Sequence, residues 1–170
     1  AGHRPPEDEL RAIERYFATA PIDNPDGEQG IDLHLRVDEE VPANPTTRST
    51  NQSGPLNDIW DYEERYAQLT TTGHYWALVV EDARNRNAPS GEIGGYAFGS
   101  DFMVQADAID DNVLVHELGH VLGLAPFQYR GIDSRSVSFE TYPSVMNYNA
   151  PRDYAQFSDG TSAQGDHDDW

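Results

Sequence analysis

The stretch Val115-His116-Glu117-Leu118-Gly119-His120-Val121-Leu122-Gly123 contains the pattern H-E-x-x-H. On a helix, residues four positions apart lie on one face, so His116 and His120 can direct two imidazoles at one metal ion. Zinc binds imidazole nitrogen readily, and a catalytic zinc site keeps one position open for water. Glu117 stands beside the first histidine and can accept a proton from that water. The spacing therefore predicts a catalytic zinc site with two histidine ligands and a glutamate base.

The residues around the motif favour this interpretation over two ordinary histidines on a solvated helix face. Most of the neighbouring positions are apolar, which predicts a largely buried helix. Buried His and Glu side chains need polar partners, and a metal ion supplies them. Gly123 is suited to end the helix, and the three residues that precede the helix are candidate N-caps. The apolar positions are Val113, Leu114, Leu118, Val121 and Leu122, and the cap candidates are Asp110, Asp111 and Asn112.

The charge of the chain is strongly negative. Its 170 residues include 30 acidic and 11 basic ones, which gives a formal net charge of −19, and every basic residue is Arg. Such a field repels nucleic acid and anionic membranes, so neither is expected as a partner. The acids are spread along the chain and 11% of residues are aromatic, which indicates a folded domain rather than an acidic tail. An acidic surface without Lys resembles proteins of salt-accumulating halophiles, where molar salt reduces the Debye length to ~3 Å.

The length predicts one domain, residues 1–170, with 1–123 as an upper and 124–170 as a lower subdomain, and we expect a monomer. The chain has no Cys, so neither a disulfide nor a thiolate ligand is expected. No apolar run approaches the ~20 residues of a membrane span. The chain begins Ala1-Gly2-His3 without an apolar signal segment, as a mature or trimmed form would.

The hydrophobic pattern predicts an α+β fold with a twisted mixed sheet. It predicts amphipathic helices at residues 7–20 and 56–69, and a half-buried strand at 31–38. The core stripe expected for the second helix consists of Leu56, Ile59, Trp60, Tyr66 and Leu69. It further predicts a buried central strand at 74–81, a polar turn at 85–91, a glycine-rich edge strand at 92–99 and a strand at 102–108 before the motif helix. The glycines of the edge strand suit the close approach of another backbone. After Gly123 the regular pattern stops, which predicts an irregular C-terminal segment.

Together these features resemble the metzincins, a clan of zinc peptidases named for a methionine turn beneath the metal. His116 to Gly123 matches the positions H-E-x-x-H-x-x-G, and Ser144-Val145-Met146-Asn147-Tyr148 is similar to the S-x-M-x-Y turn of astacins and serralysins. The predicted order of elements also resembles the upper subdomain of the clan. The strong motifs cover about a fifth of the chain, and the fold resemblance covers most of it more coarsely.

The resemblance implies a secreted, extracellular zinc endopeptidase that cleaves peptide or protein substrates. It implies that Met146 forms a hydrophobic floor under the zinc, and that Tyr148 is a resting ligand or a donor to the oxyanion. An extended substrate would pair with the edge strand, which makes Gly94, Gly95, Tyr96 and Ala97 the candidate substrate-binding residues.

The chain departs from the clan at the third ligand. Metzincins place His or Asp three residues after the motif glycine, and this chain has Pro126 there. A catalytic zinc needs a third protein ligand. We expect Asp133, on the loop between the motif helix and the methionine turn, with Glu140 and His167 as alternatives.

Two further possibilities remain open at this level. The acidic run from Asp159 to Asp169 is rich in the oxygen ligands that Ca²⁺ prefers, but it lacks EF-hand spacing, so a solvated loop is the expectation. The alternative functions are a catalytically silent metal-binding surface or interaction protein, which the proline at position 126 favours, and a zinc hydrolase of non-peptide amides. Glu117 argues against the silent protein.

Overall fold

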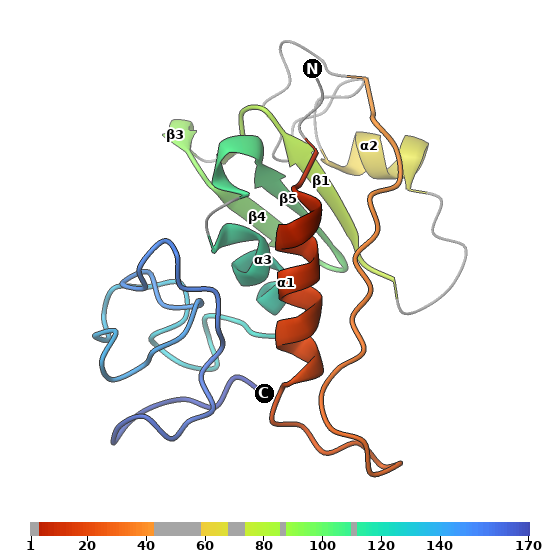
Figure 1. The fold of residues 1–170 in the computed structure, drawn as a ribbon. Helices are drawn as coiled ribbons and strands as arrows, with labels where there is room; N and C mark the ends of the chain where they lie inside the picture. Colours follow the sequence, from red (N-terminus) through yellow and green to blue (C-terminus); the bar gives the residue numbers. More distant parts are fainter. Residues whose placement is uncertain (1–3, 43–58, 68–73, 86–87, 110–111) are drawn as a thin grey trace. The chain divides into compact units, whose positions relative to one another are not determined.

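The computed structural model describes residues 4–42, 59–67, 74–85, 88–109 and 112–170. These residues form a small α+β structure with three α-helices and a three-stranded mixed sheet (Figure 1). A two-stranded sheet accompanies the larger one. In chain order the elements are α1 (Glu7–Ala18), α2 (Ile59–Tyr66), β1 (Trp76–Val80), β2 (Arg84–Asn85), β3 (Ala88–Glu92), β4 (Gly95–Phe98), β5 (Asp101–Gln105), the short 3-10 helix η1 (Ala106–Ala108) and α3 (Val113–Val121).

The chain divides into two compact units. One contains Ala1–Arg4 and Asp38–Gly123, and the other contains Pro5–Val37 and Leu124–Trp170. The first unit thus includes the sheets, α2 and α3, and the second joins α1 to the irregular C-terminal segment. The predicted boundary after Gly123 is also a boundary of these units, and the single-domain interpretation stays a prediction. No helix among the described residues is long and apolar enough to span a membrane.

The larger sheet has the order β1-β5-β4. β5 pairs in parallel with β1 and antiparallel with β4, and a two-residue turn at Gly99-Ser100 connects β4 to β5. Gly99 has a φ of 59°, which glycine adopts without steric cost. The prediction of an edge strand at 92–99 is confirmed by β4. The prediction that 74–81 is central is wrong within the described sheet, because β1 lies at its other edge and β5 is the buried middle strand.

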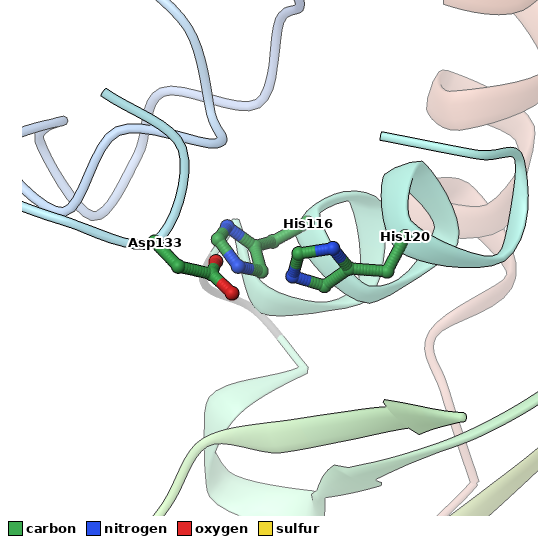
Figure 2. Close-up of side chains that lie close together, drawn as sticks. All are labelled: His116, His120 and Asp133. Carbon is green, nitrogen blue, oxygen red and sulfur yellow. The ribbon is translucent and has the colours of Figure 1, made fainter. Parts of the chain in front are cut away.

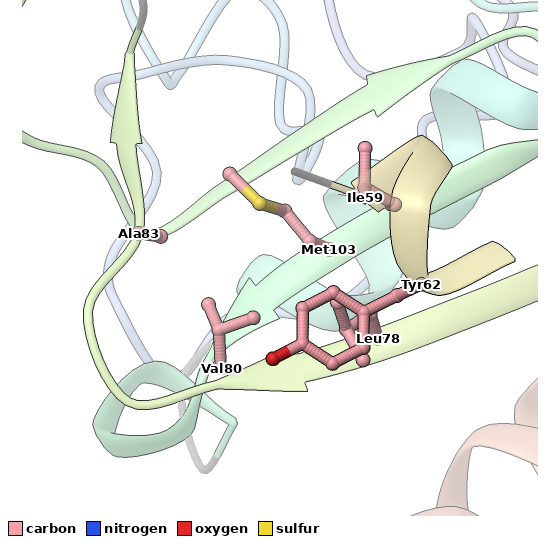
Figure 3. Packing of buried hydrophobic residues seen from close by; sticks show 6 residues of the cluster. All are labelled: Ile59, Tyr62, Leu78, Val80, Ala83 and Met103. Atoms are coloured by element: carbon pink, nitrogen blue, oxygen red, sulfur yellow. The ribbon is translucent and has the colours of Figure 1, made fainter. Parts of the chain in front are cut away.

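The two faces of this sheet are covered by different helices. Met103 of β5 belongs to an apolar cluster that joins α2 to β1, shown in Figure 3. Val104, the neighbour of Met103, directs its side chain to the opposite face of the sheet. Gly95 pairs with Val104 and therefore lies on that same opposite face. α3 packs against β4 and β5 on that face. The members of the cluster are Ile59, Tyr62, Leu78, Val80, Ala83 and Met103.

Two local predictions in this unit need correction. Residues 85–91 were expected to be a turn, but β2 and β3 form an antiparallel pair there. Trp60 was expected in the core stripe of α2, but 42% of it is exposed, and Tyr62 is buried in its place. Trp60 instead contacts Phe98 edge-on, with ring centroids 5.0 Å apart. Leu56 and Leu69, the other ends of the predicted stripe, lie outside the described residues.

In the second unit, α1 confirms the predicted amphipathic helix. Leu10, Phe17 and the following Ala20 are buried. The predicted strand at 31–38 is absent: the segment is extended but has no strand assignment (Figure 1). Its alternation is nevertheless real, because the apolar residues are half-buried and the polar ones exposed. A side chain replaces a strand partner, since the amide of Leu35 donates to Glu14 Oε1 at 2.8 Å.

The C-terminal segment confirms the prediction of irregular structure. Residues 124–170, all of which the structure describes, contain turns and one isolated bridge but no helix or regular strand. Aromatic contacts join this segment to α1, where Phe17 packs edge-on against Phe157 and Trp170 with centroids 5.9 and 5.7 Å apart. The amide of Phe157 donates to the hydroxyl of Tyr16 at 2.5 Å.

A buried carboxyl group begins β5. Asp101 is 5% exposed, and its Oδ1 has no hydrogen-bond partner among the described residues. Burial raises the pKa of Asp101 above its ordinary value, although hydrogen bonds from Glu63, Ser100 and the Trp76 backbone oppose the shift. Burial likewise raises the pKa of Glu63, and the nearby Asp101 adds to that increase.

Candidate metal centre

Helix α3 presents the two histidines of the motif on one face. It runs from Val113 to Val121, and the four-residue spacing brings the rings of His116 and His120 to a centroid distance of 4.9 Å. Gly123 follows with a φ of 118° and donates its amide to the His120 carbonyl, which confirms the predicted helix end. Asn112 occupies the N-cap position without a side-chain capping bond. The other cap candidates, Asp110 and Asp111, lie outside the described residues.

Asp133 completes a group of three possible metal ligands. His116, His120 and Asp133 each offer one ligand atom, and these atoms all lie within 4.8 Å of one another. Figure 2 shows the carboxylate of Asp133 directed toward the two imidazoles. His116 is 8% exposed, and the other two are partly buried. Two imidazole nitrogens and one carboxylate are a donor set that suits zinc and leaves a coordination position for water. The residues present therefore fit a zinc ion.

The backbone around Asp133 holds it in an unusual conformation. Asp133 has a φ of 52° and is the one non-glycine residue with positive φ in the described chain. Its amide donates to the Met146 carbonyl at 3.0 Å, and the amide of Tyr148 donates to the Ser134 carbonyl at 3.1 Å. These two bonds fasten the loop that carries Asp133 to the predicted methionine turn. A non-glycine residue keeps a left-handed backbone conformation only where the surrounding structure holds it there, and such residues cluster at functional sites.

The carboxylate of Glu117 lies against the glycine-rich edge strand. A Cβ atom added to Gly95 would lie 2.6 Å from Glu117 Cγ, 2.7 Å from Oε1 and 2.9 Å from Cδ. At Gly94 an added Cβ would instead meet Val113, with Cγ2 3.0 Å away. The groups that closely approach these glycines are therefore side chains of α3, whereas the sequence predicted the approach of another backbone. Glu117 is 6% exposed, so its placement is determined by packing.

The predicted methionine turn is a buried, hydrogen-bonded structure. Met146 is fully buried, and its amide donates to Ser144 Oγ at 3.0 Å. Asn147 is 1% exposed, and its amide nitrogen donates to three backbone carbonyls at 2.9–3.3 Å, those of Val137, Ser138 and Tyr142. Sequence reasoning missed the roles of Ser144 and Asn147. A signal was present, since a Ser and an Asn flank an apolar pair in a segment without regular structure.

The remaining predicted residues lie outside the three-ligand group. Tyr148 is 49% exposed, and its role as ligand or donor stays a prediction. Glu140 is exposed, and His167 stacks on Tyr129 with centroids 4.9 Å apart and an interplanar angle of 11°. Pro126 is exposed on the loop after α3. Of the alternatives for the third ligand, only Asp133 belongs to the group.

The acidic C-terminal run bonds mainly to its own segment. Asp166 accepts hydrogen bonds from the Ser158 hydroxyl and from the Ser162 and His167 amides, at 2.8–2.9 Å. Asp159 accepts from the hydroxyl and amide of Thr161. Within the described chain, no second group of three or more potential ligands accompanies His116, His120 and Asp133. No cluster among the described residues therefore supports calcium binding in this run.

The arrangement combines a possible metal-binding group with a carboxylate next in sequence to one of its ligands. Such a combination can activate water for attack on a carbonyl compound. The side chain of this residue, Glu117, also lies against β4, an edge strand with which an extended chain can pair. Comparisons with protein-family models, curated proteins and solved structures found no match to this chain, so any functional assignment depends on these residues.

Proposed function

We propose that this protein is a metzincin-like zinc endopeptidase adapted to high salt. The observation that carries the proposal is the grouping of His116, His120 and Asp133, with Glu117 beside them in sequence. Asp133 takes the place of the ligand that Pro126 cannot provide. The S-x-M-x-Y pattern adds support, because the Met146 carbonyl binds the amide of the Asp133 residue that completes the group.

The residues of the chain divide the work of peptide hydrolysis. His116, His120 and Asp133 would hold the ion, which as a Lewis acid lowers the pKa of water and polarises a carbonyl group. Glu117 accepts a proton from the attacking water and delivers it to the leaving amine as the peptide bond breaks. Tyr148 donates a hydrogen bond to the developing oxyanion. Met146 would take the role that the resemblance implies, an apolar residue beneath the metal.

The substrate class follows from the edge strand. β4 pairs with β5 on one side, and no described strand pairs with its other side. An extended peptide can add there through backbone hydrogen bonds. Gly94, Gly95, Tyr96 and Ala97 would form this contact, and the side chain of Glu117 already lies against Gly95. The proposed substrate is therefore an extended segment of a protein rather than a small amide.

The test combines metal content with turnover in molar salt. We expect about one zinc per chain, retained in Glu140→Ala and lost in Asp133→Ala. We also expect cleavage of an unfolded protein by the wild-type chain. Zinc binding without cleavage would favour the silent metal-binding protein, and cleavage confined to non-peptide amides would favour the other hydrolase. A wild-type chain that binds no zinc after reloading would overturn the proposal.

A further inference from the structure

We propose that Asp169 is a positioning residue that sets the placement of Asp133 through Ser144 and Met146. This inference rests on the proposed role of Asp133 as a metal ligand, but it does not depend on peptidase activity. Asp169 lies 36 positions after Asp133 in the acidic run that otherwise bonds mainly to itself. Unlike the other acidic residues of this run, Asp169 accepts a hydrogen bond from the methionine turn through its carboxylate.

A continuous series of hydrogen bonds connects the two aspartates. The Ser144 hydroxyl donates to Asp169 Oδ2 at 2.5 Å. Ser144 Oγ accepts the Met146 amide at 3.0 Å, and the Met146 carbonyl accepts the Asp133 amide at 3.0 Å. Ser144 and Met146 are fully buried, so water does not compete for these bonds. The series fixes the peptide units on both sides of Met146.

The chemistry of Ser144 explains why a carboxylate suits position 169. A hydroxyl group has one hydrogen to donate and lone pairs to accept with. An ionised carboxylate only accepts, so it directs that hydrogen to itself and leaves a lone pair for the Met146 amide. Two more donors hold the carboxylate in place: the Tyr142 hydroxyl reaches Oδ1 at 2.6 Å, and the Ser158 amide reaches Oδ2 at 2.9 Å.

The conformation of Asp133 gives this series its consequence. A φ of 52° is unfavourable for a residue with a side chain, so the loop adopts it only while its bonds hold it there. When the turn loses Asp169, the Met146 peptide can rotate and the Asp133 backbone can relax. The carboxylate would then move away from the position where it groups with the histidines. Groups that bond directly to metal ligands typically change metal affinity by 10–100-fold when mutated, and we expect Asp169, which acts through Ser144 and Met146, to reach the lower end of that range.

The experiment measures zinc affinity by competition with a chelator, in molar salt. Asp169→Ala and Ser144→Ala should each weaken zinc binding about tenfold or more. Asp169→Asn should retain most of the zinc affinity of the wild type. The carbonyl oxygen of the new side chain can replace Oδ2, and the Tyr142 hydroxyl can turn to accept a hydrogen bond from the side-chain amide. Cobalt loaded in place of zinc should show an altered visible spectrum in the Ala variants and a near-normal one in the Asn variant.

Asp166→Ala is the matched control. Asp166 lies in the same segment and accepts hydrogen bonds from three donors, but none of these is Ser144 or a residue after it in the turn. We expect it to lower the unfolding midpoint of the metal-free protein as Asp169→Ala does, while zinc affinity stays close to that of the wild type. Ser144→Ala removes one oxygen atom and keeps the test available if Asp169→Ala does not fold.

The outcomes separate this inference from the proposed function. Equal losses of zinc affinity in Asp169→Ala and Asp166→Ala would overturn the inference and leave the peptidase proposal intact. Unchanged zinc affinity in Ser144→Ala would do the same. A chain that shows the expected order of affinities but cleaves no peptide would uphold the inference and overturn the peptidase. A wild-type chain without zinc would overturn both.

Discussion

The substitution Gly95→Ala tests whether the edge strand places Glu117. The added methyl carbon would lie 2.6 Å from Glu117 Cγ and 2.7 Å from Oε1, where ordinary contacts begin near 3.4 Å. Because the obstructing atoms belong to a side chain, Glu117 can withdraw while the sheet keeps its backbone pairing. It would have to move by about 0.8 Å, since a shorter withdrawal leaves the overlap in place.

A displacement of this size at a proposed base should affect turnover far more than stability. Misplacement of a catalytic group by about 1 Å can reduce the rate by ~10²-fold, because proton transfer requires hydrogen-bond distance. We therefore expect Gly95→Ala to lower kcat about a hundredfold. Zinc content should stay that of the wild type, since neither histidine is displaced. The unfolding free energy should fall by about 1–3 kcal/mol from crowding.

The assay compares kcat, zinc content and urea unfolding for wild type, Gly95→Ala and Gly94→Ala. Gly94→Ala is the matched control, because its methyl group would meet Val113 at 3.0 Å rather than Glu117. It should cost comparable stability but only several-fold in kcat. Equal losses of kcat in the two variants would refute the reasoning, and so would a Gly95→Ala enzyme with wild-type turnover.

Three further predictions concern other residues. Glu117→Gln should lower turnover by at least about a hundredfold with zinc still bound, because an amide cannot accept the proton; kinetics and metal content on one sample test this, and retained activity would exclude the proposed base. Asn147→Ala should lower the free energy of unfolding by about 2–4 kcal/mol, because buried carbonyls lose their donor; a change near zero in urea unfolding would contradict it. The raised pKa of Asp101 implies that its contribution to stability is present below its unfolded pKa and is lost as pH rises through its folded pKa. The stability of Asp101→Asn relative to the wild type should therefore increase as the pH rises from acidic to neutral. A stability difference that does not change with pH would show the assignment to be wrong.

Local patterns predicted the parts of this protein that depend on short spacings. The four-residue interval of His116 and His120 determines their common face on any helix. The paired glycines at 94 and 95 marked a place of close approach, but the approaching groups are side chains of α3 and not the backbone that was predicted. Asp133 was expected as the third ligand because it lies between the helix and the methionine turn, and it is the candidate that belongs to the group.

The features that sequence reasoning missed depend on distant partners. The alternation in residues 31–38 correctly predicted which side chains are half-buried, but Leu35 bonds to the carboxylate of Glu14, 21 positions earlier, instead of a strand. Ser144 finds its acceptor in Asp169, 25 positions later. Neither partner differs in type from its many acidic neighbours. The residue type therefore gave no basis for selecting Glu14 within α1 or Asp169 within the C-terminal acidic run.

The aromatic contact between α1 and the end of the sequence has a consequence for biosynthesis. The bond from the Phe157 amide to the Tyr16 hydroxyl closes an interval of 141 residues, and Trp170 packs against Phe17. A ribosome that adds 5–20 residues per second needs roughly 7–30 s to make that interval. The nascent chain thus exposes the apolar stripe of α1 throughout this time. The unit that carries Asp133 cannot close until its last aromatic residues emerge, so a growing chain acquires the histidine pair well before its carboxylate partner is fixed.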